Sequence, residues 1–373
     1  MHRRTSSRRQ FLRGHSAVEA LAGLAQALPT AGAATEQAEP AGDHYLVQFG
    51  RRAMACRFEA FLNAGQYPQA SDVVFEALDL VDQLEAQLTV YRDTSELMRI
   101  NRSAGEGPVE VEPALFALIA QAVQLHDETQ GAFDITSGPL SKVWGFYRRA
   151  GALPDEAQLA AALDSVGSRW LDLDSQARTV RFGRPGMELN LGAIGKGYAL
   201  DQAARLMLSR GIDDFLWHAG SSSVLARGNR SGAGPGGPGD PGQSPGWIVA
   251  LDHPMRPGRR LAELRLVDRA LGTSGSGTQF FRHRGRRYGH LLDPRTGRPA
   301  EGVISSTVVA PTAAEADALA TAFYILGPQQ AQAWCQRHPE VGMLMLVPSP
   351  DRNELQVVSA GLAAADCRWI TQP

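Results

Sequence analysis

Helical and extended segments alternate along this chain without the regular strand–helix–strand rhythm that builds a parallel sheet. Apolar residues recur with the helical period in four segments, which are predicted as helices: 71–88, 113–131, 155–163 and 196–210. Short apolar runs predict strands at 45–62, where two strands pair around Arg51 and Arg52, and at 224–226, 247–251, 261–267, 305–310 and 341–347. This order predicts an α+β fold, a single large two-lobed domain with a mixed or antiparallel sheet and packed helices.

Composition limits the function classes. With 43% hydrophobic residues and a net charge of −2, the chain has enough apolar material for a core and no basic excess for binding nucleic acid. Its three cysteines, Cys56, Cys335 and Cys367, lack the spacing of a zinc cluster, and their odd number argues against a disulfide framework. No run of 18 apolar residues occurs, so we expect the protein to meet a membrane only through a partner protein.

The first 34 residues have the composition of a targeting segment. They begin with arginines, including the run SRRQFLR at 7–13, continue with an alanine- and leucine-rich stretch at 17–28 and end in small residues at 30–34. This order is typical of a signal peptide, and the paired arginines resemble a twin-arginine export signal. We therefore predict a mature domain at 35–373, located in the bacterial periplasm or at the outer face of the inner membrane. A disordered basic tail is the alternative.

One internal segment interrupts the domain. Residues 228–246 contain eight glycines and four prolines in 19 positions, a composition that supports neither a helix nor a strand ladder. We expect a mobile surface loop inserted into a hairpin between the strands at 224–226 and 247–251.

Two segments place glycine beside polar residues. In 131–139, Asp134 and Thr136 flank a turn, where they either cap backbone groups or take part in chemistry. In 189–201, three glycines lie at a strand-to-helix junction and permit close approach of a ligand. Lys196 begins that helix, where its charge opposes the macrodipole unless an anion is bound, so the segment indicates a phosphate site.

A third segment joins a glycine- and serine-rich run at 272–278 to His290 and the sequence DPRTG at 293–297. The DPRTG sequence is typical of a turn, so Asp293 and Arg295 are expected to be structural. His290 precedes this turn at the end of an expected strand. It is either a packed histidine or a catalytic base.

A fourth segment, 312–322, is alanine-rich and helical. Asp317 and Thr321 are four residues apart, so both side chains lie on one face. A carboxylate and a hydroxyl are hard oxygen donors that suit Mg²⁺ shared with phosphate oxygens. The alternative is a solvated face with a routine Asp–Thr contact, but the alanine-rich surroundings would place this aspartate at a buried surface.

Together these segments resemble the FAD:protein FMN transferase (ApbE) family. The resemblance extends from about 54 to 326 and is carried by YRDTSELMRIN at 91–101, GAFDIT, GPL, WGF, LGAIGKGYALD, TSG, GHLLDPRTG and ADALATA. It implies an exported, flavin-binding α+β enzyme that uses Mg²⁺. Such an enzyme transfers FMN from FAD to a threonine or serine of a partner protein and releases AMP.

The resemblance also implies roles for individual residues. The implied FAD contacts are Met54, Tyr91, Ala132, Phe133, Asp134, Asn190, Lys196 and Leu291. The implied metal ligands are the carbonyl of Ala193 and the side chains of Asp317 and Thr321. Because the attacking hydroxyl is a weak nucleophile, a general base is expected. His290 is the hypothesis for this base, with Asp134 as the alternative or as an orienting group.

The chain departs from the family pattern at three places, one of which is the run AGSSS at 219–223, where a glycine pair with aspartate or asparagine is usual. Ala55 and Cys56 follow Met54 where Gly-Thr is usual, and Asn190 stands where aspartate is common. Two other functions therefore stay open: a Mg²⁺-dependent FAD pyrophosphatase that yields FMN and AMP, and a non-catalytic flavin-binding protein of the envelope.

Overall fold

The computed structural model of the chain describes residues 45–230, 246–256, 258–277, 279–349 and 355–371. The predicted signal peptide at 1–34 and most of the Gly/Pro-rich segment, 231–245, lie outside the described residues. Residues 44–373 form one compact unit. None of the helices in the described ranges is long and apolar enough to cross a membrane.

The centre of this unit is an eight-stranded sheet, and each of its neighbouring pairs is antiparallel. In spatial order the strands are β1 (Leu46–Ala53), β2 (Cys56–Asn63), β6 (Phe215–Ala219), β7 (Ser223–Arg227), β10 (Ala270–Gly275), β13 (Ser305–Ala310), β14 (Gly342–Pro348) and β15 (Leu355–Ala360). The predicted α+β class is confirmed, with the antiparallel form of its main sheet.

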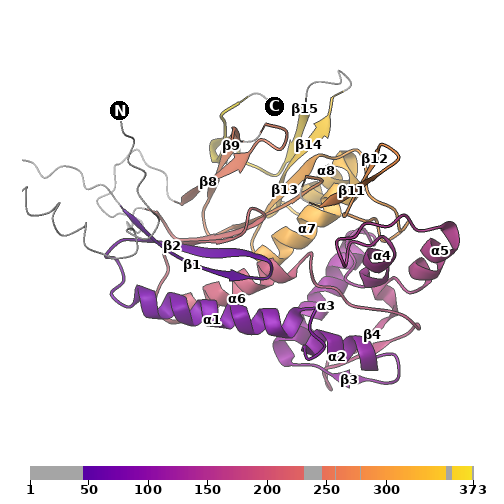
Figure 1. Ribbon diagram of the computed structural model, residues 1–373. Helices are drawn as coiled ribbons and strands as arrows, with labels where there is room; N and C mark the ends of the chain where they lie inside the picture. The colour runs from indigo at the N-terminus through magenta and orange to yellow at the C-terminus, as the bar shows by residue number, and fades with distance from the viewer. Residues whose placement is uncertain (1–44, 231–245, 257, 278, 350–354, 372–373) are drawn as a thin grey trace, which may run out of the picture. The chain divides into compact units, whose positions relative to one another are not determined.

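Alternate residues of the central strands point to opposite faces of the sheet, and both faces are buried. On one face Phe58, Trp217 and Val308 join the main core with four helices. These are α1 (Ala70–Leu88), α6 (Gly195–Ser209), α7 (Ala313–Leu326) and α8 (Pro328–Arg337). On the other face Leu216 and Val309 pack in a second cluster under a three-stranded sheet. It consists of β8 (Trp247–Asp252), β9 (Arg260–Leu266) and β16 (Cys367–Trp369). Figure 1 shows the helices and the small sheet on opposite sides of the large sheet.

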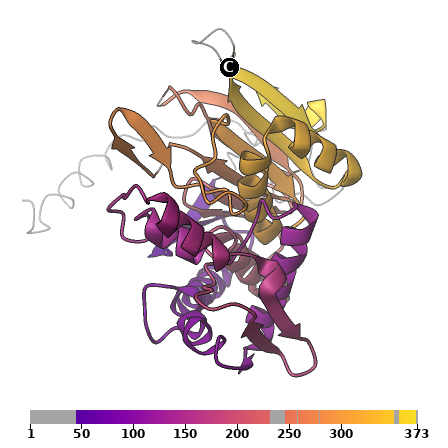
Figure 2. The same cartoon turned by 90° about the vertical axis from the view of Figure 1, so that its right-hand side faces the viewer.

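The remaining helices and strands lie outside the large sheet and the three-stranded sheet of β8, β9 and β16. They are α2 (Glu96–Ser103), β3 (Val109–Glu110), α3 (Pro113–Glu128), α4 (Gly138–Val143), α5 (Glu156–Asp164), β4 (Leu171–Asp174), β5 (Thr179–Phe182), β11 (Phe280–His283) and β12 (Arg286–Gly289). The β11–β12 hairpin packs on the segment that follows α4, because Phe281 and Tyr288 contact a cluster containing Trp144 and Phe146 (Figure 2).

Most of the predicted elements are present, with three local corrections. The first hairpin turns at Met54 and Ala55, not at Arg51 and Arg52, because only the former pair has the left-handed backbone that a two-residue hairpin turn needs. The helix predicted to begin at Ser71 begins one residue earlier, at Ala70, so that Gln69 and not Ser71 is the N-cap of α1. The strands on either side of the Gly/Pro-rich segment do not form a hairpin, because β7 belongs to the large sheet and β8 to the small one.

Candidate active site

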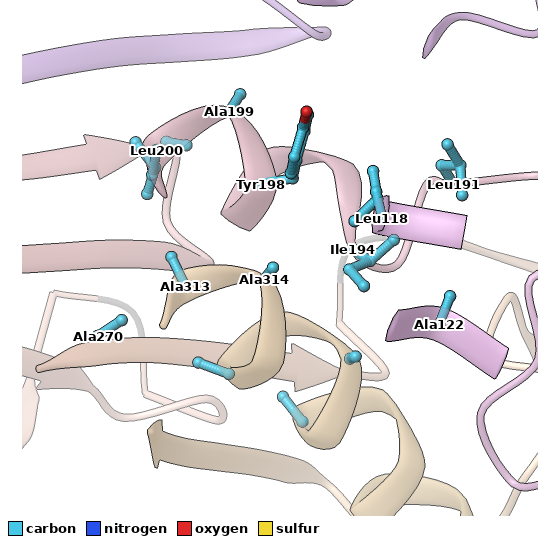
Figure 3. Packing of buried hydrophobic residues seen from close by; sticks show 14 of the residues in the cluster. Leu118, Ala122, Leu191, Ile194, Tyr198, Ala199, Leu200, Ala270, Ala313 and Ala314 are labelled. Carbon is cyan, nitrogen blue, oxygen red and sulfur yellow. The ribbon is translucent and has the colours of Figure 1, made fainter. Parts of the chain in front are cut away.

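The site is built where the first turns of α6 and α7 touch, next to β10 (Figure 3). Two glycines permit this approach. A Cβ on Gly197 would lie 2.0 Å from the carbonyl oxygen of Ala313, and a Cβ on Gly272 would lie 2.4 Å from that of Ala316. The glycines of the motifs LGAIGKGYALD and TSG therefore determine how closely α7 approaches its neighbours.

Asp201 fixes the start of α7. Its two carboxylate oxygens accept hydrogen bonds from the backbone N–H groups of Ala313 and Ala314, each at 2.9 Å. These donors belong to the first turn of the helix, where no carbonyl of the helix can reach them. Asp201, the last residue of the LGAIGKGYALD motif, therefore caps the N-terminus of α7, the helix that carries the ADALATA motif.

Asp317 lies one turn into α7 and is buried, with 8% of its surface exposed. Its Oδ2 accepts from the backbone N–H of Gly197 at 2.7 Å, and its Oδ1 accepts from the hydroxyl of Ser223 at 2.7 Å. Burial raises the pKa of this carboxyl to about 6, although the positive charge of Lys196 and the two hydrogen bonds act in the opposite direction. A cation placed beside this carboxylate would favour its charged form.

Two further oxygens can join Asp317. Thr321 follows on the same face of α7, and its hydroxyl is 3.0 Å from that of Ser274 on β10. Ala193 is four residues before Gly197, so a regular helix would direct the Gly197 N–H to its carbonyl. That N–H donates to Asp317 instead. Within the described ranges no hydrogen bond reaches the carbonyl oxygen of Ala193, which leaves it available to a ligand.

A carboxylate, a hydroxyl and a backbone carbonyl fit Mg²⁺, which uses few protein ligands and takes the rest from water and phosphate oxygens. In the part of the chain that the structure describes, no group of three or more His, Cys, Asp and Glu side chains could hold a metal. The candidate cation site therefore depends on the single carboxylate of Asp317, and a bound cation would need oxygens from a substrate to complete its shell.

Lys196 connects this site to the end of β6. Its ammonium group donates to the hydroxyl of Ser222, which lies 3.3 Å from the hydroxyl of Ser223, the partner of Asp317. A cation, a carboxylate and two hydroxyls thus form one network. Because this network lies at the N-terminus of α6, where the helix dipole favours negative charge, it suits an anionic group such as a pyrophosphate.

His290 lies near Lys196 in a half-buried position. Its Nδ1 is 3.0 Å from the carbonyl oxygen of Gln279, and since a carbonyl only accepts, Nδ1 carries the proton and Nε2 is the acceptor in the neutral ring. Burial lowers the pKa of His290 below its usual value, and the charge of Lys196 acts in the same direction. The imidazole is therefore neutral near pH 7 and able to take a proton at Nε2.

Comparison with known proteins shows the family to which this chain belongs. A sequence model of the ApbE family matches residues 54–345, well over half of the 373 residues. The chain belongs to the ApbE family.

Its relatives cover most of the described unit. The chain is 36% identical over 266 residues to the FAD:protein FMN transferase of Salmonella typhimurium, which covers 68% of this chain and 72% of the relative. It is 33% identical over 304 residues to the protein of that name from Treponema pallidum, which covers 80% and 83%. The solved flavin transferase ApbE from Vibrio cholerae matches with a TM-score of 0.72 and 26% identity over 85% of this chain and 97% of that one.

The ApbE-family motif GAFDIT has a structural role at Asp134. One of its oxygens accepts from the backbone N–H and the hydroxyl of Thr136, at 2.8 and 2.7 Å, and from the hydroxyl of Ser168 at 2.7 Å. The other accepts from the backbone N–H of Ser168 at 3.0 Å and lies 3.1 Å from Nδ1 of His126. These partners occupy the carboxylate, so its proposed catalytic role stays a prediction that its hydrogen bonding does not favour.

His126 and Asp134 form a buried ion pair. Burial works against the charged imidazolium, but the hydrogen bond and the charge of Asp134 outweigh it and raise the pKa of His126. Burial likewise opposes the carboxylate, but the hydrogen bonds from His126 and Thr136 lower the pKa of Asp134. Sequence reasoning missed His126, because nothing in its spacing shows that the turn at 131–139 folds back onto α3.

Ala132 and Phe133, which the family resemblance implies as FAD contacts, are buried. Their exposed fractions are 0% and 1%, and Phe133 belongs to the main core. The backbone N–H of Phe133 donates to the hydroxyl of Thr129, and its carbonyl lies 3.2 Å from Nδ1 of His126. The contacts of these two residues with FAD stay a prediction that this burial does not favour.

The other implied FAD contacts lie on loops around the network. Tyr91 is 70% exposed, and its ring lies 5.0 Å from that of Tyr147. Asn190 uses its Oδ1 to accept from the backbone N–H of Gly192 at 2.9 Å, which shapes the turn before α6. Met54 and Leu291 are half-buried at the edge of the main core. Their contacts with FAD stay predictions.

Two residues of the network and one aromatic partner were not predicted. Ser222 and Ser223 belong to the run AGSSS at 219–223. Their hydrogen bonds to Lys196 and Asp317 depend on tertiary folding, in which β7 pairs with β10 and Ser223 lies opposite Gly272. Tyr147 follows the WGF motif directly and could have been found as an aromatic residue close to it.

Proposed function

We propose that this chain is an FAD:protein FMN transferase, which moves FMN from FAD to a threonine or serine of an acceptor protein and releases AMP. The observation that carries the proposal is the joint placement of buried Asp317, cationic Lys196 and a neutral His290 with a free Nε2. The names of the relatives from Salmonella typhimurium and Treponema pallidum support the same activity.

In the proposed reaction the acceptor hydroxyl attacks the flavin-side phosphorus of FAD. The new bond joins this phosphorus to the acceptor oxygen, and the bond to the bridging oxygen breaks, so that AMP leaves with that oxygen. Nε2 of His290 takes the hydroxyl proton, and Lys196 compensates the charge that develops on the phosphoryl groups. Because His290 is neutral near pH 7, it needs no prior loss of a proton.

We further propose that Asp317, Thr321 and the carbonyl of Ala193 hold Mg²⁺. When bound there, this cation neutralises negative charge on the pyrophosphate oxygens. Asp317 is the only carboxylate among these ligands, and burial raises its pKa to about 6, so a cation bound beside it would compensate the desolvation of its charge. The pairing of the Asp317 oxygens with Gly197 and Ser223 fixes the direction in which the carboxylate presents its remaining lone pairs.

FAD is proposed to bind beside Lys196, with Tyr91 and Tyr147 as an aromatic surface for one of its ring systems. Two rings at 5.0 Å, with Tyr91 largely exposed, offer a face on which a flavin or an adenine can stack. Residues 1–34, with their twin-arginine pattern, support export to the periplasm or the outer face of the inner membrane. The acceptor is then a protein of the same compartment.

The test follows covalent flavin on the acceptor. Purified protein, FAD and Mg²⁺ are incubated with a candidate acceptor, which is then separated on a denaturing gel and imaged by flavin fluorescence. A fluorescent acceptor band with one AMP released per FMN attached supports the transferase. AMP release that is indifferent to the acceptor would instead show a pyrophosphatase, and FAD binding without turnover would show a storage protein.

A further inference from the structure

A short hairpin next to His290 concentrates positive charge. Residues 280–289 include four arginines, Arg282, Arg284, Arg286 and Arg287, and no acidic residue, whereas the whole chain has a net charge of −2. Two more arginines, Arg148 and Arg149, are exposed on the loop that packs against this hairpin. We call these six side chains the arginine surface.

Much of this charge is available to a partner. Arg282 and Arg284 are exposed, and no carboxylate of the described residues lies within ion-pair distance of either. Arg286 pairs with Glu301 at 2.7 Å, but both side chains are about two-thirds exposed, so this pair is weak. Arg287 lies 3.9 Å from the centre of the Phe280 ring, which is itself 43% exposed.

The arginine surface is directly connected to the proposed base. The carbonyl of Gln279, just before β11, accepts from both the backbone N–H and Nδ1 of His290, which follows β12. The Gln279 side chain donates to the carbonyl of Phe146 at 3.1 Å. A cavity of about 170 Å³ lies here, lined by Phe146, Arg149, Gln279 and Phe280 among others. Arg286 and His290 are four positions apart along the chain, which spans at most about 13 Å when extended.

We propose that the arginine surface docks an acidic segment of the acceptor protein and so brings its hydroxyl to His290. This inference rests on the proposed function. A row of available cations attracts an acidic partner and fixes its orientation more than it adds affinity. The pyrophosphate of FAD has its own cation in Lys196. A protein is favoured over a lipid surface or nucleic acid because the arginines adjoin the group that must reach the acceptor, and because the cavity beside Phe280 can take an apolar side chain.

The test measures binding and transfer separately. Fluorescein-labelled peptides carry one threonine flanked either by aspartate and glutamate or by asparagine and glutamine, and their affinities are measured by fluorescence anisotropy. Wild-type protein is compared with Arg282→Glu/Arg284→Glu. Arg178→Glu/Arg181→Glu, at exposed positions in the turn before β5 and on β5 itself, is the matched control. For wild type and both double variants, FAD affinity is measured by flavin fluorescence. The KM for the acceptor protein is measured in the FMN-transfer reaction.

We expect at least 10-fold tighter binding of the acidic peptide by wild type and by the control, with this preference lost in Arg282→Glu/Arg284→Glu. The KM for the acceptor should rise at least 10-fold in that variant, while FAD affinity stays within 2-fold. Weakened FAD affinity, equal binding of both peptides, or loss of binding to phosphatidylglycerol vesicles with peptide binding intact would overturn the docking proposal. Peptide docking without any FMN transfer would overturn the proposed function instead.

Discussion

At the scale of single residues, the neutral state of His290 is the property that the proposed chemistry needs most. We expect His290→Gln to lower kcat for FMN transfer by about 10²- to 10⁴-fold, the usual contribution of a general base, with FAD affinity unchanged. Because burial lowers the pKa of His290, transfer by the wild type should lose activity only at a pH below about 6.5. A pH profile of kcat/KM tests this. If His290→Gln keeps the same acidic limb, the histidine is not the titrating base.

The His126–Asp134 pair predicts a pH dependence of stability. The pKa of His126 is raised, so its contribution is present below the unfolded value near 6.5 and lost as the pH rises through the folded value. The pKa of Asp134 is lowered, so its contribution is present above about 3.9 and lost as the pH falls through its folded value. The pair therefore stabilises most between about pH 4 and 6.5.

Asp134→Asn should reduce the free energy of unfolding by about 3 kcal/mol at pH 6, because it leaves a buried His126 without its partner. At pH 9 the loss should be smaller, because the imidazole is then neutral in both proteins. Urea unfolding at the two pH values measures this difference. Thr136→Val is the control, since it removes a hydrogen bond to Asp134 and leaves the ion pair. An equal loss at both pH values would contradict the pairing.

At the scale of elements, the contact between α6 and α7 should tolerate no side chain at Gly197. The added Cβ of Gly197→Ala would meet backbone atoms of Ala313 and Ala314 at 2.0 to 2.6 Å, so the first turn of α7 must move and shift Asp317. We expect a destabilisation of about 1–3 kcal/mol, typical of overpacking, together with loss of transfer.

Gly195→Ala, in the same motif, is the matched control. Its Cβ would find nothing closer than 3.9 Å, so we expect no loss of stability and retained activity. Thermal unfolding and FMN-transfer assays of Gly197→Ala and Gly195→Ala test this difference. If the two substitutions have equal effects, the motif does not depend on the close approach of the helices.

The sequence predicted those elements whose signals are local. The helical spacing of Asp317 and Thr321, the helix predicted at 196–210 and the strand at Ser305–Ala310 all follow from neighbouring residues. It did not predict contacts formed by tertiary folding. Ser223 meets Asp317 across 94 residues of chain, and the strands flanking 231–245 belong to two sheets that pack on each other, with Val224 and Trp247 in one apolar cluster.

At the scale of the whole described unit, the network joins parts of the chain that are far apart in sequence. Asp317 of α7 holds the backbone of α6 across 120 residues, and Asp201 of α6 caps α7 in return. This mutual attachment places the only buried carboxylate of the proposed metal site at the junction of two helices and the sheet. A ligand bound there contacts several elements at once and binds the folded state alone.

Mg²⁺ should therefore stabilise the protein against heat. At a concentration ten times its Kd, a ligand specific for the folded state adds about 1.4 kcal/mol, which corresponds to roughly 2–4 °C in Tm. We expect this rise with wild type in Mg²⁺ and FAD, and its reversal by EDTA. Asp317→Asn should lose the rise while keeping its fold, because the amide oxygen can still accept from Gly197. An equal Mg²⁺-dependent rise in the variant would place the cation elsewhere, since no other carboxylate belongs to the proposed ligand set.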